Sequence, residues 1–220
     1  AELPEIKGDI EMDFCALSVK DFLKKVAEKS PTPGGGAVGA VVAALAASLG
    51  SMVANLTIGK KGYEDVEGHM ESVLETCEAE SVYLCELVNK DIQAFDQVMS
   101  AYKLPKATEE EKNAREMKIQ QALKTAIEVP FDLARRCKNI IISIERLAKW
   151  GNLNVLSDAE SAAYLLIAVY KIAYANVMIN MKSLKDAEYS AWISDEMSQL
   201  DRQMTSTYDR IMDVLGKRNG

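Results

Sequence analysis

Hydrophobic residues dominate one stretch of the chain, residues 34–59, in which no residue is charged. Small residues recur there at every fourth position, and a stripe of larger side chains runs beside them. This spacing is typical of an α-helix, so the stretch predicts a helix that is apolar on all sides and must be enclosed by other apolar surface. The small positions are Gly35, Gly39, Ala43, Ala47 and Ser51, and the larger ones are Val42, Leu45, Leu49, Met52 and Leu56.

This uncharged helix has two interpretations, a membrane span or the central helix of a soluble bundle. It reaches the length of about 20 residues that a span requires, and its small residues are spaced as in packed membrane helices. Alanine and glycine are only weakly hydrophobic, however, and Ser48, Asn55 and Thr57 add polar groups. No second segment is expected to span, and no signal-peptide pattern accompanies this one. We therefore favour the soluble bundle and expect no membrane partner.

One further helix is predicted before the uncharged stretch and one after it. Residues 1–16 lack periodicity and are expected to form a surface arm, after which Ser18 offers an N-cap for a short amphipathic helix that ends before Pro31. Residues 65–102 repeat apolar positions at alternating spacings of four and three, as one long helix does. That seam consists of Met70, Leu74, Cys77, Ser81, Leu84, Val88, Asp91, Phe95, Val98 and Tyr102.

The second half of the chain also predicts helices only. A capping box at Thr108 starts a helix that kinks or breaks at Pro130 and then resumes. A second capping box, at Ser157, opens an apolar helix over 162–184, and a last amphipathic helix follows. No alternating strand pattern and no internal repeat is evident. The sequence therefore predicts an all-α, multihelical bundle, with residues 1–220 forming a single domain.

Composition restricts the kinds of partner. With a net charge of -7 and a pI near 5.0, the chain has no dense block of basic residues, so nucleic acid is not expected as a partner. The cysteines lack C-x-x-C spacing and His69 is the single histidine, so neither a zinc site nor a disulfide framework is expected. We expect small buried cysteines in a reduced, cytoplasmic protein. The cysteines are Cys15, Cys77, Cys85 and Cys137.

Asp91 is the one ionisable carboxylate in the seam of the long helix. Burying an ionised carboxylate is costly unless it is paired or its pKa rises, and such groups are candidates for acid or base catalysis. The structural alternative is an aspartate bonded to a lysine of a neighbouring helix or to a capped helix end. Periodicity alone leaves both interpretations open.

Three glycines precede the uncharged helix and follow Pro31 and Pro33, which stiffen the chain. Gly34, Gly35 and Gly36 are able to place backbone N–H groups at a helix N-terminus against an anionic or electron-rich ligand. The alternative is a tight turn that lets the helix pack closely. We expect valine at Gly35 to be damaging, because a β-branched residue tolerates neither a positive φ nor a close backbone approach.

Other polar residues are candidates for binding but have ordinary structural explanations. Lys60 and Lys61 suit the C-terminal dipole of a helix, and they are also the nearest cations for a ligand that carries carboxylates. Asn152 and Asp158 lie in a polar connection typical of turns and caps. Asn176 and Asn180, four residues apart, interrupt an apolar helix. Amides in such a place more often join helices than bind ligands.

Seven short segments, taken in order, cover nearly the whole chain: S-V-K-D-F-L (18–23), S-P-T-P-G-G-G (30–36), M-V-A-N-L-T-I-G-K-K (52–61), D-I-Q-A-F (91–95), L-P-K (104–106), G-N-L-N-V-L-S-D (151–158) and N-V-M-I-N-M (176–181). Together they resemble the cyclodeaminase/cyclohydrolase family of tetrahydrofolate enzymes. That family includes the cyclodeaminase half of formiminotransferase-cyclodeaminase and stand-alone methenyltetrahydrofolate cyclohydrolases. It commonly has serine where this chain has Ala37 and leucine where it has Met181, which weakens any role for a hydroxyl at position 37.

The resemblance implies an all-helical homodimer whose folate site uses the glycine segment and the acid of the D-x-x-A-F element, here Asp91. It implies hydrolysis of 5,10-methenyltetrahydrofolate to 10-formyltetrahydrofolate, cyclisation of 5-formiminotetrahydrofolate with release of ammonia, or both. Both reactions pass through a tetrahedral carbon between N5 and N10, where one aspartate is able to stabilise positive charge and transfer protons. No metal or cofactor beyond the tetrahydrofolate substrate is then required.

The same resemblance assigns roles to the remaining candidates. Substrate contacts are expected from Pro33 and the three glycines and from Asn152, Asp158 and Asn180. Folate carries a glutamate tail, often several residues long, and an acidic protein must hold it with local cations. In the sequence, the neighbouring lysines at positions 60 and 61 are best placed for that.

Three questions stay open from the sequence. The acid that holds the aminopyrimidine edge of the pterin is Asp91, Asp158 or Glu160, and the two reactions are not separable. A helical scaffold or folate-binding module is the alternative function, although it gives no reason for an aspartate in a seam beside three glycines.

The apolar helix also leads us to expect an obligate homodimer, with its small stripe in close contact between subunits.

Overall fold

The computed structural model describes residues 13–219, and within that range it consists of helices and their connections, with no strand. The all-α prediction is confirmed. Most of the arm expected over 1–16 lies outside the described residues. The elements are η1 (Phe14–Ala16), α1 (Val19–Val26), α2 (Gly35–Asn55), η2 (Glu64–Val66), α3 (Glu67–Tyr102), α4 (Glu109–Trp150), η3 (Leu153–Val155), α5 (Leu156–Met181) and α6 (Ala187–Asn219).

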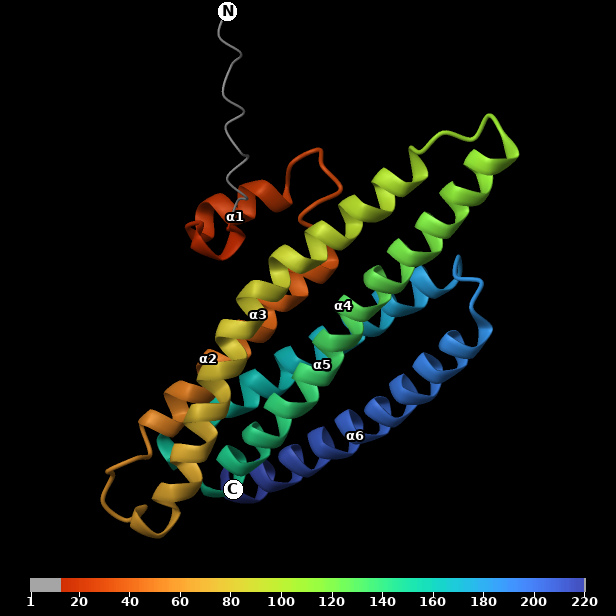
Figure 1. Cartoon of the computed structure of the whole chain (residues 1–220). Helices are drawn as coiled ribbons and strands as arrows, with labels where there is room; N and C mark the ends of the chain where they lie inside the picture. Colours follow the sequence, from red (N-terminus) through yellow and green to blue (C-terminus); the bar gives the residue numbers. More distant parts are fainter. Residues whose placement is uncertain (1–12, 220) are drawn as a thin grey trace, which may run out of the picture.

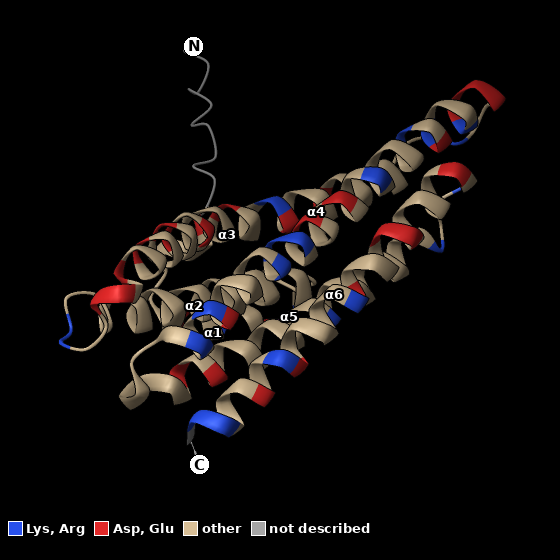
Figure 2. Cartoon of the chain, turned by 90° about the horizontal axis from the view of Figure 1, so that it is seen from below, with Lys and Arg blue, Asp and Glu red and all other residues tan. Residues whose placement is uncertain are grey.

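The long helices form one elongated bundle (Figure 1). Helix α2 packs against α3 and α5, and α4 packs against α3, α5 and α6. One hydrophobic core runs through α2 to α6, while α1 lies beside the bundle near the start of α2 (Figure 1). Charged residues follow the other long helices, and α2 carries none (Figure 2). The uncharged stretch is therefore a helix of the bundle core, as predicted, but one chain does not enclose it on all sides, because Leu45, Met52 and Leu56 stay exposed.

The small face of α2 lies inward and its bulky stripe lies outward. Gly39, Ala43 and Ala47 are buried, and a Cβ at Gly39 would meet side chains of α4 and α5 at 3.4 Å. On the other side, Leu45 is 57% and Leu56 is 48% exposed. The expectation that the small stripe mediates contact between subunits is therefore wrong, because that stripe lets α2 pack closely within its own chain.

Two helices are apolar and long enough to cross a membrane by length and composition alone. They are α2, with a mean hydropathy of 2.0, and the segment Leu153–Met181, with 1.6. The expectation that no second such segment exists was wrong. Of the apolar window in α2, 56% is buried inside the bundle, as in a core helix. The absence of a membrane partner stays a prediction.

Capping predictions were right for two helices and wrong for one. Ser18 accepts the Asp21 N–H at 3.1 Å at the start of α1, and Thr108 forms the expected capping box at the start of α4. Helix α5 instead begins at Leu156, and its N-cap residue makes no side-chain bond. The turn η3 leads directly into it, so the predicted capping box at Ser157 does not form.

Pro130 lies inside α4, which is continuous from Glu109 to Trp150, so the predicted break does not occur. Proline lacks the N–H that would reach the carbonyl of Ala126, four residues earlier. The amide nitrogen of Asn180 donates to that carbonyl at 2.8 Å from α5. A side chain of the neighbouring helix thus supplies the missing donor.

The seam of α3 is inward over most of its length and drifts at its end. Met70, Cys77 and Val88 are fully buried, but Tyr102 is 41% exposed and Ala101 is buried instead. A straight helix turns about 20° per heptad away from a strict 3.5-residue repeat, which accounts for the shift.

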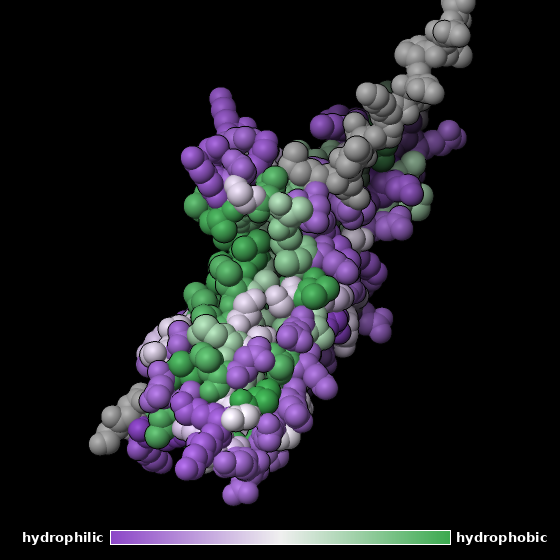
Figure 3. All heavy atoms as spheres, turned by 90° about the vertical axis from the view of Figure 1, so that its left-hand side faces the viewer, coloured by the Kyte–Doolittle hydropathy of each residue, from purple (hydrophilic) through white to green (hydrophobic). Residues whose placement is uncertain are grey.

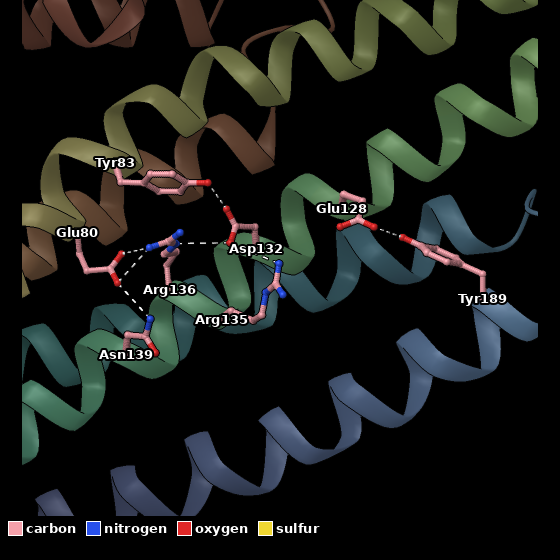
Figure 4. Close-up of polar contacts among 8 residues, drawn as sticks. All are labelled: Glu80, Tyr83, Glu128, Asp132, Arg135, Arg136, Asn139 and Tyr189. Atoms are coloured by element: carbon pink, nitrogen blue, oxygen red, sulfur yellow. Dashed lines mark hydrogen bonds and ion pairs between the residues drawn. The ribbon is translucent and has the colours of Figure 1, made fainter.

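A buried polar network joins α3 to α4 (Figure 4). Glu80 is 6% exposed and lies 3.4 Å from the Arg136 guanidinium, which stacks 3.8 Å from the centre of the Tyr83 ring. The Tyr83 hydroxyl donates to Asp132 at 2.6 Å, and Asn139 donates to Glu80 at 3.2 Å. These partners satisfy charges that would otherwise be costly to bury. The sequence pattern did not indicate this network.

Candidate active site

A cleft of about 360 Å³ lies where the start of α2 meets α3 and α5. Among the described residues that line it, Asp91 is the one ionisable group. Apolar side chains and backbone form most of the wall. The lining consists of Pro31, Thr32, Gly34, Gly35, Gly36, Asp91, Ala94, Phe95, Val98, Ala126, Asn176, Ile179 and Asn180.

Asp91 bonds to a helix end, as the structural alternative expected, and it also lines the cleft. Its Oδ2 accepts the backbone N–H of Ala37 at 2.9 Å, so it satisfies one of the donors at the N-terminus of α2. The residue is half-buried. Burial raises the pKa of the Asp91 carboxyl above its usual value, and the Ala37 hydrogen bond opposes part of that rise. The group is therefore a caged carboxylate that still faces the cleft.

The three glycines differ in what they permit. A Cβ at Gly36 would lie 2.6 Å from Asp91 Cγ, so only glycine allows the carboxylate to approach α2 this closely. At Gly35 a Cβ would be 3.9 Å from the Asn176 amide, an ordinary contact. Among the described glycines, positive φ occurs at Gly59 and Gly62 and not in this segment. The expectation of a positive φ at Gly35 was wrong, and the close approach falls on Gly36.

The start of α2 brings backbone donors to the cleft. Gly34 is extended at the N-cap and Val38 makes the first helical bond to its carbonyl, at 3.0 Å. The N–H groups of the first turn have no partner within a helix, and those of Gly35 and Gly36 border the cleft. Pro33 is buried behind this turn, after a cis peptide bond, and is not among the lining residues.

Two amides of α5 face the same cleft. Asn176 donates from its amide nitrogen to the carbonyl of Ile172 at 2.8 Å, and Asn180 donates to Ala126 of α4 at 2.8 Å. Asn180 thus joins two helices, as the structural interpretation of these amides expected, whereas the Asn176 bond stays within α5. Their oxygens offer acceptors to a ligand, and each nitrogen has a second N–H beside the one that these bonds use.

The cleft therefore offers a defined set of chemical groups. Acceptors come from Asp91, Asn176 and Asn180, donors come from the first turn of α2, and Phe95 adds an aromatic wall. Such a site suits a flat heteroaromatic ligand that has several N–H donors and carries positive charge near the carboxylate. Within residues 13–219, no group of three or more His, Cys, Asp or Glu side chains could hold a metal ion.

Comparison with known proteins places the chain in a family. The family model described as formiminotransferase-cyclodeaminase matches residues 18–199. The chain belongs to this family. The resemblance inferred from the seven segments is therefore confirmed.

Relatives of this formiminotransferase-cyclodeaminase family chain align with most of its length. It is 42% identical over 198 residues to a methenyltetrahydrofolate cyclohydrolase of Methylorubrum extorquens. That alignment covers 90% of this chain and 95% of the relative. It is 37% identical to the formimidoyltransferase-cyclodeaminase of Gallus gallus, of which it spans only 36%. The crystal structure of formiminotetrahydrofolate cyclodeaminase from Thermotoga maritima matches with a TM-score of 0.84 and 42% identity, over 92% of this chain and 97% of that one.

Four of the candidate site residues in this chain lie away from the cleft. Lys60 and Lys61 follow the far end of α2, whose 21 residues span about 30 Å. Asp158 lies in the first turn of α5 at that same end, and Asn152 donates to the Leu56 carbonyl at 2.9 Å. Within one chain the structure does not bring these residues to Asp91. The reason is that α2 runs straight from one group to the other.

Asn152 has a structural role at that far end. Its backbone N–H donates to Thr57 Oγ1 at 3.0 Å, and its Oδ1 accepts the Asn154 N–H at 3.1 Å. Both ends of its amide are thus engaged in closing α2 and opening η3. The acid alternatives Asp158 and Glu160 lie on this side as well, and Glu160 accepts the hydroxyl of Tyr164 at 2.7 Å.

Sequence reasoning missed part of the lining. Ala126 and Ile179 line the cleft from α4 and α5, yet their residue types look like ordinary core positions. Pro130 could have indicated a role for Ala126, because a proline inside a helix leaves the carbonyl four residues before it without its helical donor. Asn180 donates to that carbonyl.

Proposed function

We propose that this chain is a tetrahydrofolate enzyme that acts on the one-carbon unit between N5 and N10. The relatives named cyclohydrolase and cyclodeaminase are equally similar to it, at 42% identity, and each aligns over nearly its full length. The observation that carries the proposal is the Asp91 carboxylate, caged at the N-terminus of α2 and facing a cleft of acceptors. That arrangement suits a substrate with a cationic carbon and a donor-rich pterin.

In the cyclohydrolase reaction, Asp91 would act as general base and as a counter-charge. Its carboxylate stabilises the methenyl cation and takes a proton from the water that attacks the bridge carbon. The resulting tetrahedral carbon then loses its bond to N5, which receives a proton, and the carbon stays on N10 as a formyl group. One proton is released to solvent. The raised pKa of Asp91 favours proton uptake from water more than that of an exposed aspartate would.

In the cyclodeaminase reaction the same carboxylate would serve the same carbon. N10 attacks the carbon of the protonated formimino group, whose nitrogen carries two hydrogens, and the N10 proton passes to Asp91. The proton is then delivered to the departing nitrogen, which leaves as ammonia. The amide oxygens of Asn176 and Asn180 would accept from the N–H groups of the pterin and hold N5 and N10 in place.

Two assays test the function and separate the reactions. Adding the protein to 5,10-methenyltetrahydrofolate is expected to accelerate loss of the methenyl absorbance, with 10-formyltetrahydrofolate as product. Adding it to 5-formiminotetrahydrofolate is expected to release ammonia as methenyl absorbance appears. Activity with neither substrate would favour a helical scaffold, and binding without turnover would favour a folate-binding module.

The proposed enzyme is a cytoplasmic homodimer that needs no cofactor beyond its substrate. The proposal of a second subunit is supported by an apolar surface that stays exposed in the single chain. Apolar side chains gather on one face of the molecule (Figure 3). Leu45 and Leu56 of α2 and Ile179 of α5 are 57%, 48% and 57% exposed, respectively. A two-fold interface over these residues would cover them with the same surface of a second copy.

An antiparallel pairing of α2 helices would also explain the distant lysines. The two-fold axis would place the Lys60–Lys61 turn of one subunit beside the Asp91 cleft of the other, which α2 separates within one chain. The lysines would then bind the glutamate tail of a folate held in the partner's cleft. Their contribution is electrostatic, so salt would weaken it.

Replacing Lys60 and Lys61 with alanine is expected to raise KM for polyglutamyl substrate more than for monoglutamyl substrate, with kcat nearly unchanged. Co-expression with an Asp91→Asn subunit under a second affinity tag tests the interface. In that mixed dimer one site has both Asp91 and the partner's lysines, so a low KM for polyglutamyl substrate is expected to return at about half of the wild-type kcat. A KM that stays high would mean that the lysines serve their own chain.

A further inference from the structure

Two of the four cysteines form a pair outside the cleft. Cys15 in η1 and Cys85 in α3 are half-buried, η1 packs against α3, and the two thiols are close enough for Cys85 to raise the pKa of Cys15. Cys77 and Cys137 are fully buried. The expectation that the cysteines are buried hydrophobes therefore holds for the second two and is wrong for the first two. Those two half-buried thiols come from separate elements that meet at this point.

The pair lies where the N-terminal segment meets α3. The backbone N–H of Phe14 donates to Asn89 Oδ1 at 3.4 Å, one helical turn beyond Cys85 on α3. Asp91 follows two residues later. From Cys15 the chain continues through α1 into the glycine segment that forms the rim of the cleft. The cysteine pair thus connects the segment that leads to the cleft with the helix that carries Asp91.

Among the described residues, α1 makes few contacts with the bundle. None of the residues of α1 is buried, and Val19 and Leu23 are 78% and 62% exposed. A helix of eight residues is only marginally stable without packing. A covalent link between η1 and α3 would therefore change the freedom of this segment much more than that of the packed helices.

We propose that Cys15 and Cys85 are a reversible disulfide site that ties η1 and α1 to α3. The oxidant is a small-molecule disulfide of the glutathione class. The Cys85 thiolate attacks one sulfur of the oxidant and releases the first thiol, and the Cys15 thiolate then attacks the Cys85 sulfur and releases the second. The two cysteines lose two electrons and two protons, and the oxidant becomes two thiols.

The environment of the pair makes this exchange slow at neutral pH. Burial, followed by the neighbouring Cys85 thiol, raises the pKa of the Cys15 thiol to about 12. The attacking species is the thiolate, so the rate of closure is expected to rise with pH. In a reducing compartment the pair stays open until the glutathione pool becomes oxidised.

The test is to equilibrate the full chain with oxidised glutathione at mildly alkaline pH, block free thiols, and digest with trypsin and a glutamyl endopeptidase without reduction. We expect a linked pair of peptides, one with Cys15 and one with Cys85, that separates on reduction. The intact protein should lose the mass of two hydrogen atoms. In the same digest Cys77 and Cys137 serve as internal controls, because both should appear unlinked.

Serine variants identify the bond. Cys15→Ser is expected to leave Cys85 as a stable mixed disulfide with glutathione, and Cys85→Ser to leave Cys15 unlinked, with melting temperatures near wild type for both. The proposal would be overturned if Cys15 and Cys85 both stayed free at equilibrium. It would equally be overturned if a stable mixed disulfide accumulated in the wild-type chain, or if Cys85 were linked to Cys77 or to a second copy.

Discussion

Asp91→Asn is expected to lower kcat by about 10²-fold or more, a loss of about 3 kcal/mol in transition-state stabilisation, and to leave Tm near wild type. The asparagine keeps an oxygen that is able to accept the Ala37 N–H, so the start of α2 stays capped. It carries no charge for the cationic carbon and takes no proton. Because the pKa of Asp91 is raised by burial, removing its charge does not cost folding stability.

The measurement is kcat and KM for both substrates, with Tm recorded on the same samples. Asp96→Asn is the matched control, since Asp96 is an exposed carboxylate five residues further along α3 and does not line the cleft. It is expected to behave as wild type. Near-normal turnover in the Asp91→Asn variant would remove Asp91 from the mechanism and leave it as a helix cap only.

Gly36→Ala is expected to have the second large effect, although it adds one methyl group. Its Cβ would lie 2.6 Å from Asp91 Cγ and 2.8 Å from Oδ2, so the carboxylate must move away from α2. A displacement of about 1 Å at a catalytic group costs up to about 10²-fold in rate. Overpacking also costs about 1–3 kcal/mol, and each kcal/mol lowers Tm by about 2–4 °C in a chain of this size.

The matched control for Gly36→Ala is Gly68→Ala. Gly68 is the second residue of α3, as Gly36 is of α2, but a Cβ at Gly68 would meet nothing within 4 Å. Alanine there is expected to leave activity unchanged and to raise stability by up to about 1 kcal/mol. Equal kinetics in the two variants would mean that the approach of Asp91 to α2 is not required for catalysis.

Helix positions and the residue at the centre of the cleft were predictable from the sequence, for a physical reason. An amphipathic helix repeats its apolar residues regardless of its partners, so the seam of α3 indicated both the helix and the anomalous Asp91. The N-cap at Ser18 and the capping box at Thr108 use only residues within one turn. Local chemistry of this kind is readable without knowledge of the fold.

Features that depend on a neighbouring helix were not predictable in the same way. At Pro130 a kink or a break was expected; the helix does not break, and the carbonyl that Pro130 leaves free accepts from Asn180, which lies 50 positions away in the chain. The close approach falls on Gly36 and not on Gly35 because the rotation of α2 relative to α3 decides which glycine faces Asp91. Neighbouring residues differ by about 100° around a helix, so Gly35 and Gly36 point in different directions and only one of them is able to face Asp91.

The distant lysines show a third kind of limit. The motif that contains Lys60 and Lys61 belongs to the same family pattern as the glycine segment, but a straight helix of 21 residues keeps the two apart within one chain. Sequence order contains no information about contacts that a second subunit would make. For that reason the tail-binding role of these lysines is a proposal that only an experiment on the assembled protein decides.

A crystal structure of the protein with bound 5-formyltetrahydrofolate tests the central claim most directly. We expect N5, N10 or the formyl group on N5 within about 2.6–3.2 Å of an Asp91 carboxylate oxygen, directly or through one water. We also expect the pterin against the amide oxygens of Asn176 and Asn180. Folate bound elsewhere, for instance between α4 and α6, with the Asp91 cleft left empty, would contradict that claim.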